Sequence, residues 1–264
     1  MRPRLRNPIT LRRVQTVFCL LAAVFMLGPI FAVLPISFSS GGFLSYPLPG
    51  FSLQWYERLF EFGPWLTSLR NSLVVGVSSA VLATLIGTLA ALGLSRGDVV
   101  AQQWILGIVI SPMIVPLVVS GVAMYFFLAK LGLVATFPGL ILAHTVLGVP
   151  FVVVPVLATL RGFDANLVRA AQSLGASPFA AFRRVTLPNI APGVISGALF
   201  AFATSFDEVV VAIFIAGPEQ KTLPRQMFEG LRDNIEPTIL AMSSLLVVIA
   251  ALMLATTGWL LRKS

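Results

Sequence analysis

One polar stretch interrupts this apolar chain and decides how the rest is interpreted. Residues 161–189 read RGFDANLVRAAQSLGASPFAAFRRVTLPN. In its first half, apolar residues recur at the spacing of one narrow helical face, and they are Leu167, Ala170, Ala171 and Leu174. Gly175 gives the backbone freedom that a sharp turn after a helix needs. Ser177 and Pro178 suit the N-cap and first residue of a second short helix. The stretch predicts a helix-turn-helix hook that Leu187 and Pro188 end before the next apolar run.

The composition places this hook in a membrane protein. Of 264 residues, 57% are hydrophobic and 11% are charged, and the mean hydropathy is +0.94, whereas soluble domains have about 25% charged residues. Six runs reach the length of about 20 apolar residues that crosses a bilayer, and they lie near 14–36, 72–94, 104–128, 137–160, 190–216 and 237–261. Backbone groups in lipid must be satisfied within each segment, so the runs are expected to be helices. We expect an all-α membrane protein in a single domain over 1–264, with an uncleaved first span and no soluble domain.

Lys and Arg set the expected orientation, because short cytoplasmic loops carry an excess of them. With both termini in the cytoplasm, 12 of the 18 basic residues fall in inner segments and 6 in outer ones. The loop at 161–188 is then cytoplasmic. The net charge of +8 is spread over short loops beside the membrane, which favours anionic lipid over nucleic acid as its neighbour.

The spacing within the hook resembles the EAA loop of bacterial ABC importer permeases. That loop consists of Glu-Ala-Ala, three residues, Gly, nine residues, an Ile-like residue, one more residue and Leu-Pro. This chain fits six of the seven fixed positions and has Arg169 where the family usually has Glu. In that family an ATPase subunit pulls on the loop, and the coupling residues implied here are Arg169, Ala170, Ala171, Gly175, Ala176, Ser177, Pro178, Phe179, Leu187 and Pro188. On periodicity alone, an amphipathic loop resting on the membrane surface would fit equally well.

The resemblance also implies a fold and a set of partners. The fold would be the type I ABC importer permease (MetI-like) bundle of six transmembrane helices with a cytoplasmic coupling helix, in the bacterial inner (cytoplasmic) membrane. The partners would be an ABC ATPase dimer, a second homologous permease subunit forming a heterodimer, and an extracytoplasmic solute-binding protein. The chain has no G-x-x-x-x-G-K-[ST] loop to hold phosphates. We therefore expect a pore subunit rather than an enzyme, with no cofactor or metal of its own, and ATP and Mg²⁺ bound by the ATPase.

Two further segments resemble importers of the spermidine/putrescine group. Residues 51–60 read FSLQWYERLF, and residues 205–210 read SFDEVV, with Gly-Pro at 217–218 and Leu-Pro at 223–224 after them. The substrate implied is a polyamine. Opines, iron complexes, thiamine and sulfonates are carried by relatives of similar length and stay open as alternatives. A secondary transporter fits less well, because such proteins usually show more spans or repeated halves.

Asp207 and Glu208 are the charged residues inside the six apolar runs. A charged carboxyl group at mid-bilayer costs roughly 2.5–3.5 kcal/mol on insertion scales and usually faces a polar path or an ion pair. A cationic substrate descending from outside would meet this pair before the midplane. Adjacent helix positions point in different directions, so one acid would line the path and the other would meet a neighbouring helix. A salt bridge between helices or subunits, touching no substrate, is the alternative.

Other residues carry weaker signals. His144, in the middle of the fourth run, is expected to hydrogen-bond a neighbouring helix, with proton relay as the alternative. Prolines in the third, fourth and fifth runs permit kinks. Gly87 and Ala91 give the second run a small-residue face for close helix packing. The single cysteine, Cys19, excludes an internal disulfide framework.

Overall fold

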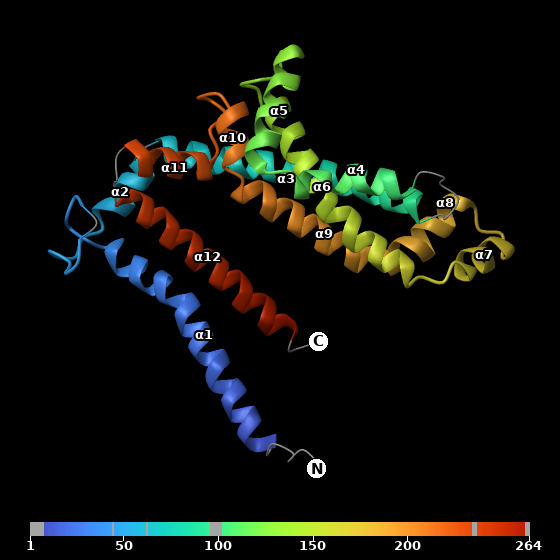
Figure 1. Ribbon diagram of the computed structural model, residues 1–264, viewed down its shortest axis with the longest axis horizontal. Coiled ribbons are helices and arrows are strands. Elements are labelled where there is room, and N and C mark those ends of the chain that lie inside the picture. Colours follow the sequence, from blue (N-terminus) through green and yellow to red (C-terminus); the bar gives the residue numbers. More distant parts are fainter. Residues whose placement is uncertain (1–7, 44, 62, 96–101, 234–236, 262–264) are drawn as a thin grey trace, which may run out of the picture. The chain divides into compact units, whose positions relative to one another are not determined.

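The computed structural model describes residues 8–43, 45–61, 63–95, 102–233 and 237–261. Within these ranges the regular elements are helices, and one isolated bridge joins Ser39 to Phe51. Figure 1 labels α1 (Pro8–Ile36), α2 (Gln54–Glu61), α3 (Gly63–Leu94), α4 (Gln102–Ile114), α5 (Leu117–Lys130), α6 (Phe137–Arg161), α7 (Asn166–Ser173), α8 (Pro178–Ala181), α9 (Leu187–Asp207), α10 (Val210–Ile215), α11 (Leu223–Asp233) and α12 (Thr238–Leu261). The chain divides into two compact units, Met1–Gly63 with Glu229–Ser264 and Pro64–Phe228.

Four helical stretches in the described residues are long and apolar enough to cross a membrane, and they are Arg12–Ile36, Gly63–Leu94, Phe137–Arg161 and Pro178–Asp207. The pair α4 and α5 gives a fifth crossing if it counts as one broken span. The part of α12 tested, Thr238–Leu252, is apolar but shorter. The all-helical membrane fold predicted from the sequence is confirmed, whereas the count of six spans stays a prediction.

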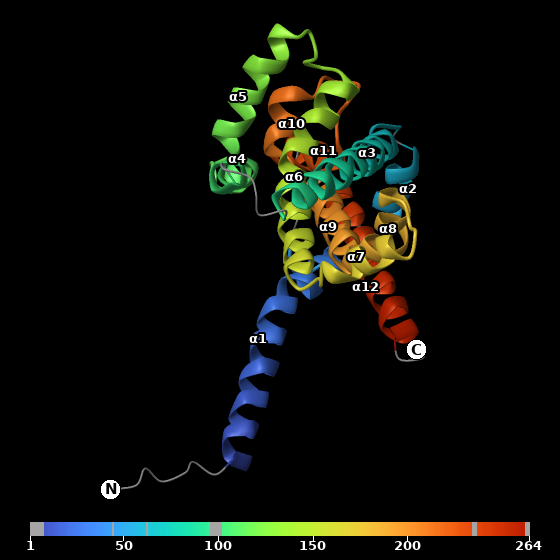
Figure 2. The same ribbon diagram turned by 90° about the vertical axis from the view of Figure 1, so that its right-hand side faces the viewer.

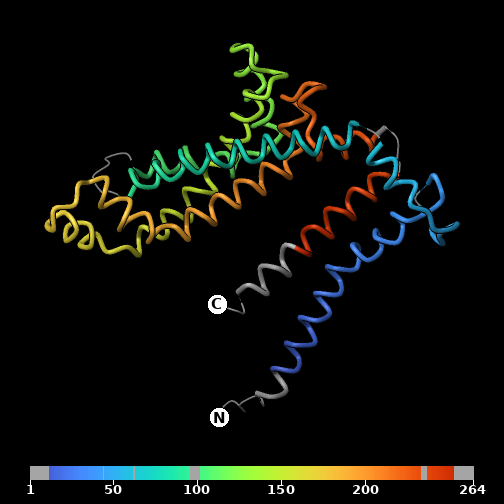
Figure 3. Tube along the Cα trace, turned by 180° about the vertical axis from the view of Figure 1, so that it is seen from behind, coloured from blue at the N-terminus to red at the C-terminus, as the bar shows by residue number. Residues whose placement is uncertain are grey.

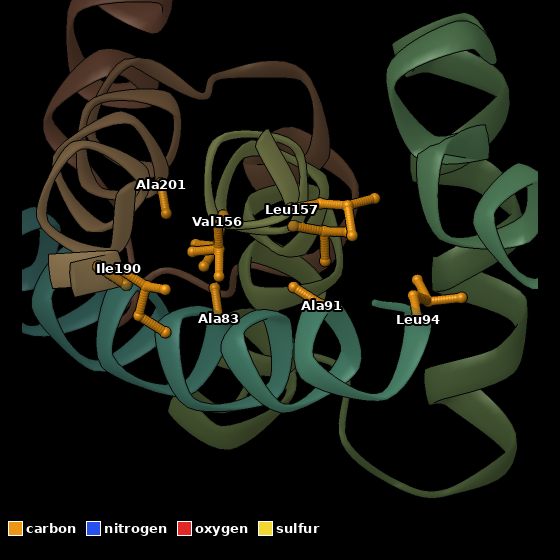
Figure 4. Close-up of a cluster of buried hydrophobic side chains, with 10 residues drawn as sticks. Ala83, Ala91, Leu94, Val156, Leu157, Ile190 and Ala201 are labelled. Carbon is orange, nitrogen blue, oxygen red and sulfur yellow. The ribbon is translucent and has the colours of Figure 1, made fainter. Parts of the chain in front are cut away.

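The core of the second unit lies where α3 packs against α6 and α9 (Figures 1 and 3). Figure 4 shows alanines of α3 facing Val156 of α6, with Ile190 and Ala201 of α9 beside them. These helices approach closely because a glycine faces the neighbouring helix at each contact. A Cβ on Gly87 of α3 would lie 2.7 Å from the Val152 Cβ, and one on Gly197 of α9 would lie 2.9 Å from the Val152 Cα. Small residues allow this approach where lipid provides little hydrophobic drive between helices. The predicted small-residue face at Gly87 and Ala91 is confirmed, since both residues are buried.

The third predicted span, 104–128, is wrong as a single helix. The structure has α4 and α5 instead, bent by 108° at the break. Pro116 precedes α5 with an extended backbone (φ −53°, ψ 131°), and the residue before a proline is forced out of helical conformation by the ring. The result is a break rather than the predicted kink. By contrast, α6 continues through Pro150 and Pro155 without interruption.

The fifth predicted span, 190–216, is also wrong as a single helix. Helix α9 ends at Asp207, Glu208 has an extended backbone with ψ of 117°, and α10 begins at Val210. Figure 2 shows α10 beside α5 and α6. There Val211 and Ile215 of α10 are buried with Leu140 and Leu147 of α6. The helix breaks where its two acidic residues stand, and the segment after the break packs into a second apolar cluster.

The first unit contains α1, α2 and α12. Its described α1 side chains are not buried within the chain. Trp55 at the start of α2 is buried, and its Nε1 donates a 2.6 Å hydrogen bond to the Ser39 carbonyl oxygen. Ser37 Oγ and the Tyr56 hydroxyl lie 2.8 Å apart. The segment 51–60, identified from the sequence, therefore anchors the loop that follows α1.

Candidate functional site

The bend of the hook is built as a helix C-cap with two backbone hydrogen bonds. After α7, Gly175 has φ of +89°, a conformation that L side chains rarely adopt. Its N–H donates to the Gln172 carbonyl (2.9 Å), and the Ala176 N–H donates to the Ala171 carbonyl (3.1 Å). This pair of bonds defines a Schellman motif, which favours glycine at the residue after the cap. The turn predicted at Gly175 is confirmed.

The second arm of the hook begins as predicted and ends differently. Ser177 Oγ accepts a hydrogen bond from the Ala180 N–H (3.2 Å), and Pro178 is the first residue of α8. The prediction that Leu187 and Pro188 end this arm is wrong. A π-helical turn, Phe182–Thr186, connects α8 directly to α9. Its wider backbone repeat makes room for the Pro188 ring, which would otherwise press on the preceding turn.

The Pro178–Asp207 stretch is therefore one 30-residue helical run. Asn189 supports the junction, because its side-chain amide donates to the Val185 carbonyl at 2.7 Å. The second arm of the hook and the membrane helix α9 are thus mechanically continuous. Figure 3 shows the hook at the end of α6 and α9, away from α5 and α10.

The hook presents apolar side chains to its surroundings. Leu174 is 90% exposed and Phe179 is 73% exposed, one on each side of the bend. Leu167 and Ala170 on α7 are also exposed. Large apolar side chains exposed together in this way mark an interaction surface. The predicted apolar face of α7 exists and is not covered by the rest of the described chain.

Arg169 lies on α7 at a cavity of about 490 Å³, here called the hook cavity. Its walls come from the C-terminal ends of α3 and α6 and from both arms of the hook, and its lining includes Ser95, Phe163, Arg169, Gln172 and Phe182. The structure thus brings Arg169 together with Pro178 of the second arm. The predicted coupling residues form one compact element, with Leu187 and Pro188 placed at the start of α9.

Asp207 and Glu208 differ in burial and in hydrogen bonding. Glu208 is buried, with 6% of its surface exposed, and its Oε1 accepts a 2.7 Å hydrogen bond from the Val211 N–H at the start of α10. Asp207 is exposed at the end of α9. Within the described residues neither carboxylate forms an ion pair. The two carboxylates thus differ in burial, and Glu208 caps the start of α10. That one acid lines the substrate path while the other meets a neighbouring helix stays a prediction.

A cleft of about 490 Å³ opens beside these two acids. Both carboxyl residues line it, together with Thr204 on the last turn of α9 and Leu117 at the start of α5. Two breaks in membrane helices, before α5 and before α10, therefore meet at the same cleft. Irregular backbone at membrane depth is tolerated where it is buried in protein or lines a polar cavity, so the cleft is the candidate substrate pathway.

A buried network of three polar side chains joins the last turn of α9 to α3 and α6. His144 Nδ1 of α6 lies 2.7 Å from Ser205 Oγ, and Ser79 Oγ of α3 donates to Ser205 Oγ at 2.9 Å. All three residues are buried. The expectation that His144 hydrogen-bonds a neighbouring helix is confirmed. Because Ser205 precedes Asp207 by two residues, the network fixes the turn that presents the carboxylate.

Three residues that were not predicted from the sequence hold the loop between α10 and α11. The Asn71 side-chain amide donates to the carbonyl oxygens of Glu219 (2.8 Å) and Lys221 (3.0 Å), and Ser72 Oγ accepts from the Leu223 N–H (2.7 Å). Arg225 donates to two carbonyls at the end of α10, one of them that of Ala216. The available signal was an Asn-Ser pair at the start of an apolar run. These bonds fix the far end of α10 and thus the position of the cleft.

The hook, the continuous helix above it and the cleft at the end of that helix define the membrane-embedded subunit of a transport system. The chain belongs to the family of binding-protein-dependent transport system inner membrane components, which matches residues 83–263.

Individual relatives cover nearly the whole chain. The spermidine/putrescine transport system permease protein PotC of Escherichia coli (strain K12) is 32% identical over 234 residues, which are 89% of this chain and 88% of PotC. The PotC protein of Haemophilus influenzae (strain ATCC 51907 / DSM 11121 / KW20 / Rd) is 30% identical over 95% of this chain and 97% of its own. The fold matches a chain of a bacterial ABC transporter involved in the import of the acidic polysaccharide alginate, with a TM-score of 0.73 and 16% identity, covering 97% of this chain and 99% of that one.

Proposed function

We propose that this chain is the permease subunit of an ATP-driven importer for polyamines such as putrescine and spermidine. Support for the substrate class comes from Asp207, an exposed carboxylate at the cleft, in a chain 32% identical to a spermidine/putrescine permease. Polyamines are cations at neutral pH, since amines titrate near pH 10. A carboxylate and an ammonium group 4 Å apart attract by about 1 kcal/mol in water and about 4 kcal/mol near a protein surface.

In this proposal the two acids have different roles. Asp207 attracts the substrate's ammonium groups, whereas Glu208 holds the start of α10 in place through the Val211 N–H. His144 and Ser79 keep the α9 terminus oriented through Ser205. The cleft then has one carboxylate available to a mobile cation and one occupied by the protein.

The hook docks in a cleft of an ATPase subunit, of which two copies bind ATP and Mg²⁺. The exposed Leu174 and Phe179 supply the apolar contact. Closure of the ATPase dimer pushes the hook, and the helical run from Pro178 to Asp207 carries that displacement to the cleft. Such a cycle needs two conformations whose balance is shifted by nucleotide.

The family and the charge pattern support the remaining features of the proposed assembly. A second permease subunit completes the pore as a heterodimer, a solute-binding protein delivers substrate from outside, and both termini lie in the cytoplasm. Opines, iron complexes, thiamine and sulfonates are the alternative solutes.

The test is transport by the purified complex in vesicles. The chain, its second permease and its ATPase are reconstituted with the binding protein outside, and uptake of labelled putrescine, spermidine, thiamine and taurine is compared with and without internal ATP. ATP-dependent uptake of a polyamine supports the proposal. Uptake driven by an ion gradient without ATP refutes the importer, and ATP-dependent uptake restricted to a non-polyamine refutes the substrate class.

A further inference from the structure

The hook cavity carries a positive charge that the described chain does not balance. Arg169 lines the cavity, and no described residue gives its guanidinium a hydrogen bond or an ion pair. The described part of the hook also carries Arg161, Arg183 and Arg184 against one acid, Asp164. Asp164 is engaged locally, because its Oδ1 accepts from the Asn166 N–H at 2.9 Å. Within the described residues, the positive charge at the cavity is therefore available to a partner.

The lining of the cavity suits a carboxylate side chain. Gln172, Ser95 and Thr186 offer further polar side chains beside Arg169, and Phe163, Phe182 and Leu160 add apolar walls. A guanidinium group binds a carboxylate with two parallel hydrogen bonds. Such a pair becomes stronger once a docked protein surface excludes water from it. The volume of about 490 Å³ is ample for one Asp or Glu side chain.

The exposed apolar side chains at the bend favour a protein surface over a free anion as the source of that carboxylate. Leu174 and Phe179 flank the bend and are largely exposed, so an occupant of the cavity that is part of a protein surface would also cover these side chains. Apolar side chains around a charged contact exclude water in protein interfaces. A free anion would leave them uncovered.

We infer that Arg169 receives an acidic side chain of the docking ATPase subunit in the hook cavity and so determines which ATPase this permease accepts. The inference rests on the proposed function, since it names the partner of the same hook. Many permeases of the resembling family have Glu at this position. An ATPase surface fitted to that Glu would present a like charge to Arg169, and juxtaposed like charges suppress pairing with the wrong partner.

The test begins with the tagged full-length chain, extracted gently from membranes, and measures the ATP hydrolysis that purifies with it. Arg169→Glu is compared with the wild type and with Arg184→Glu, which makes the same charge change on the hook outside the cavity lining. Truncating one partner of a buried charge pair at an interface costs about 2–5 kcal/mol. We therefore expect Arg169→Glu to weaken association about 30-fold or more, with Arg184→Glu close to the wild type.

A second measurement identifies the partner residue. Arg169→Lys is treated with a carbodiimide, which joins the introduced amine to a carboxylate in contact with it, and the product is mapped by mass spectrometry. The expected product joins the hook to an Asp or Glu of a subunit that contains a phosphate-binding loop. Reversing the charge of that acid is expected to restore association with Arg169→Glu.

The outcomes separate this inference from the proposed function. If the wild-type chain recovers no ATP hydrolysis, both fail. If the wild type recovers it, and Gly175→Val lowers it while Arg169→Glu and Arg184→Glu behave alike, the hook docks and the role of Arg169 is refuted. The role is also refuted if the wild type, in phosphatidylcholine vesicles without phosphatidylglycerol, loses ATP hydrolysis as much as Arg169→Glu does. The arginine would then bind lipid headgroups.

Discussion

Substitutions of the two acids at the end of α9 should have separable effects, with Glu208 needed for stability and Asp207 for transport. Glu208→Ala removes the acceptor of the 2.7 Å bond from the Val211 N–H and leaves that buried donor without a partner. Leaving a buried donor unsatisfied costs about 1–3 kcal/mol. Glu208→Gln keeps an oxygen at the same position, so most of the stability should be retained. Asp207→Asn removes no hydrogen bond or ion pair within the described residues and should leave stability unchanged.

The effect of Asp207→Asn should appear in transport. Its carboxylate is exposed, so the lower limit of its attraction for an ammonium group, about 1 kcal/mol at 4 Å, applies more closely than the upper one. Since 1.4 kcal/mol is a factor of ten, the polyamine concentration for half-maximal uptake should rise about five- to tenfold. Maximal uptake at saturating substrate should change little.

The assays are thermal unfolding of the purified chain in detergent and initial rates of labelled putrescine uptake in reconstituted vesicles. Glu219→Gln is the matched control, because it removes an exposed charge from the loop after α10 without touching the cleft. The reasoning is refuted if Glu208→Ala is as stable as the wild type. It is equally refuted if Asp207→Asn and Glu219→Gln leave the uptake curve at the same position.

Three further substitutions test the framework around these sites. Gly87→Leu should destabilise the chain by about 1–3 kcal/mol, because its Cβ would meet Val152 at 2.7 Å; an unchanged unfolding temperature would argue against the close approach of α3 and α6. His144→Phe should leave Ser205 with one partner fewer and lower stability by about 1 kcal/mol, while uptake persists in the absence of any proton gradient; strict dependence of wild-type uptake on that gradient would support proton relay instead. Gly175→Ala should cost about 1–2 kcal/mol of local strain at φ +89° and reduce ATP hydrolysis coupled to transport, and coupling equal to that of the wild type would contradict the rigid turn.

The hook could be predicted in detail because its structure depends on neighbouring residues. Gly175 and Ala176 make the two backbone hydrogen bonds of the helix C-cap, and Ser177 caps the next arm through the Ala180 N–H. These interactions span a few residues and have residue preferences that a sequence reveals. The end of the second arm was mispredicted at Pro188, because a π-helical turn accommodated the proline that normally stops a helix.

The candidate pathway was only half predictable. Two acids in an apolar run indicate a polar environment, but their separate roles depend on where α9 breaks. That break is stabilised by burying Val211 and Ile215 against α6 and by Asn71 and Arg225 holding the loop beyond α10. None of these contacts is local in the sequence, so periodicity favoured one continuous span.

The sequence by itself determined that this chain is an apolar helical membrane protein with a polar hook of defined turn chemistry and two carboxylates in an apolar run. Hydropathy and residue preference at turns are properties of short segments, so no neighbour has to be known. Only the tertiary structure decided that Asp207 is exposed while Glu208 caps α10, that Arg169 lies at a cavity, and that the hook continues into α9. Those facts depend on which distant backbone groups and side chains come within a few ångströms, and that is set by packing between helices far apart in the chain.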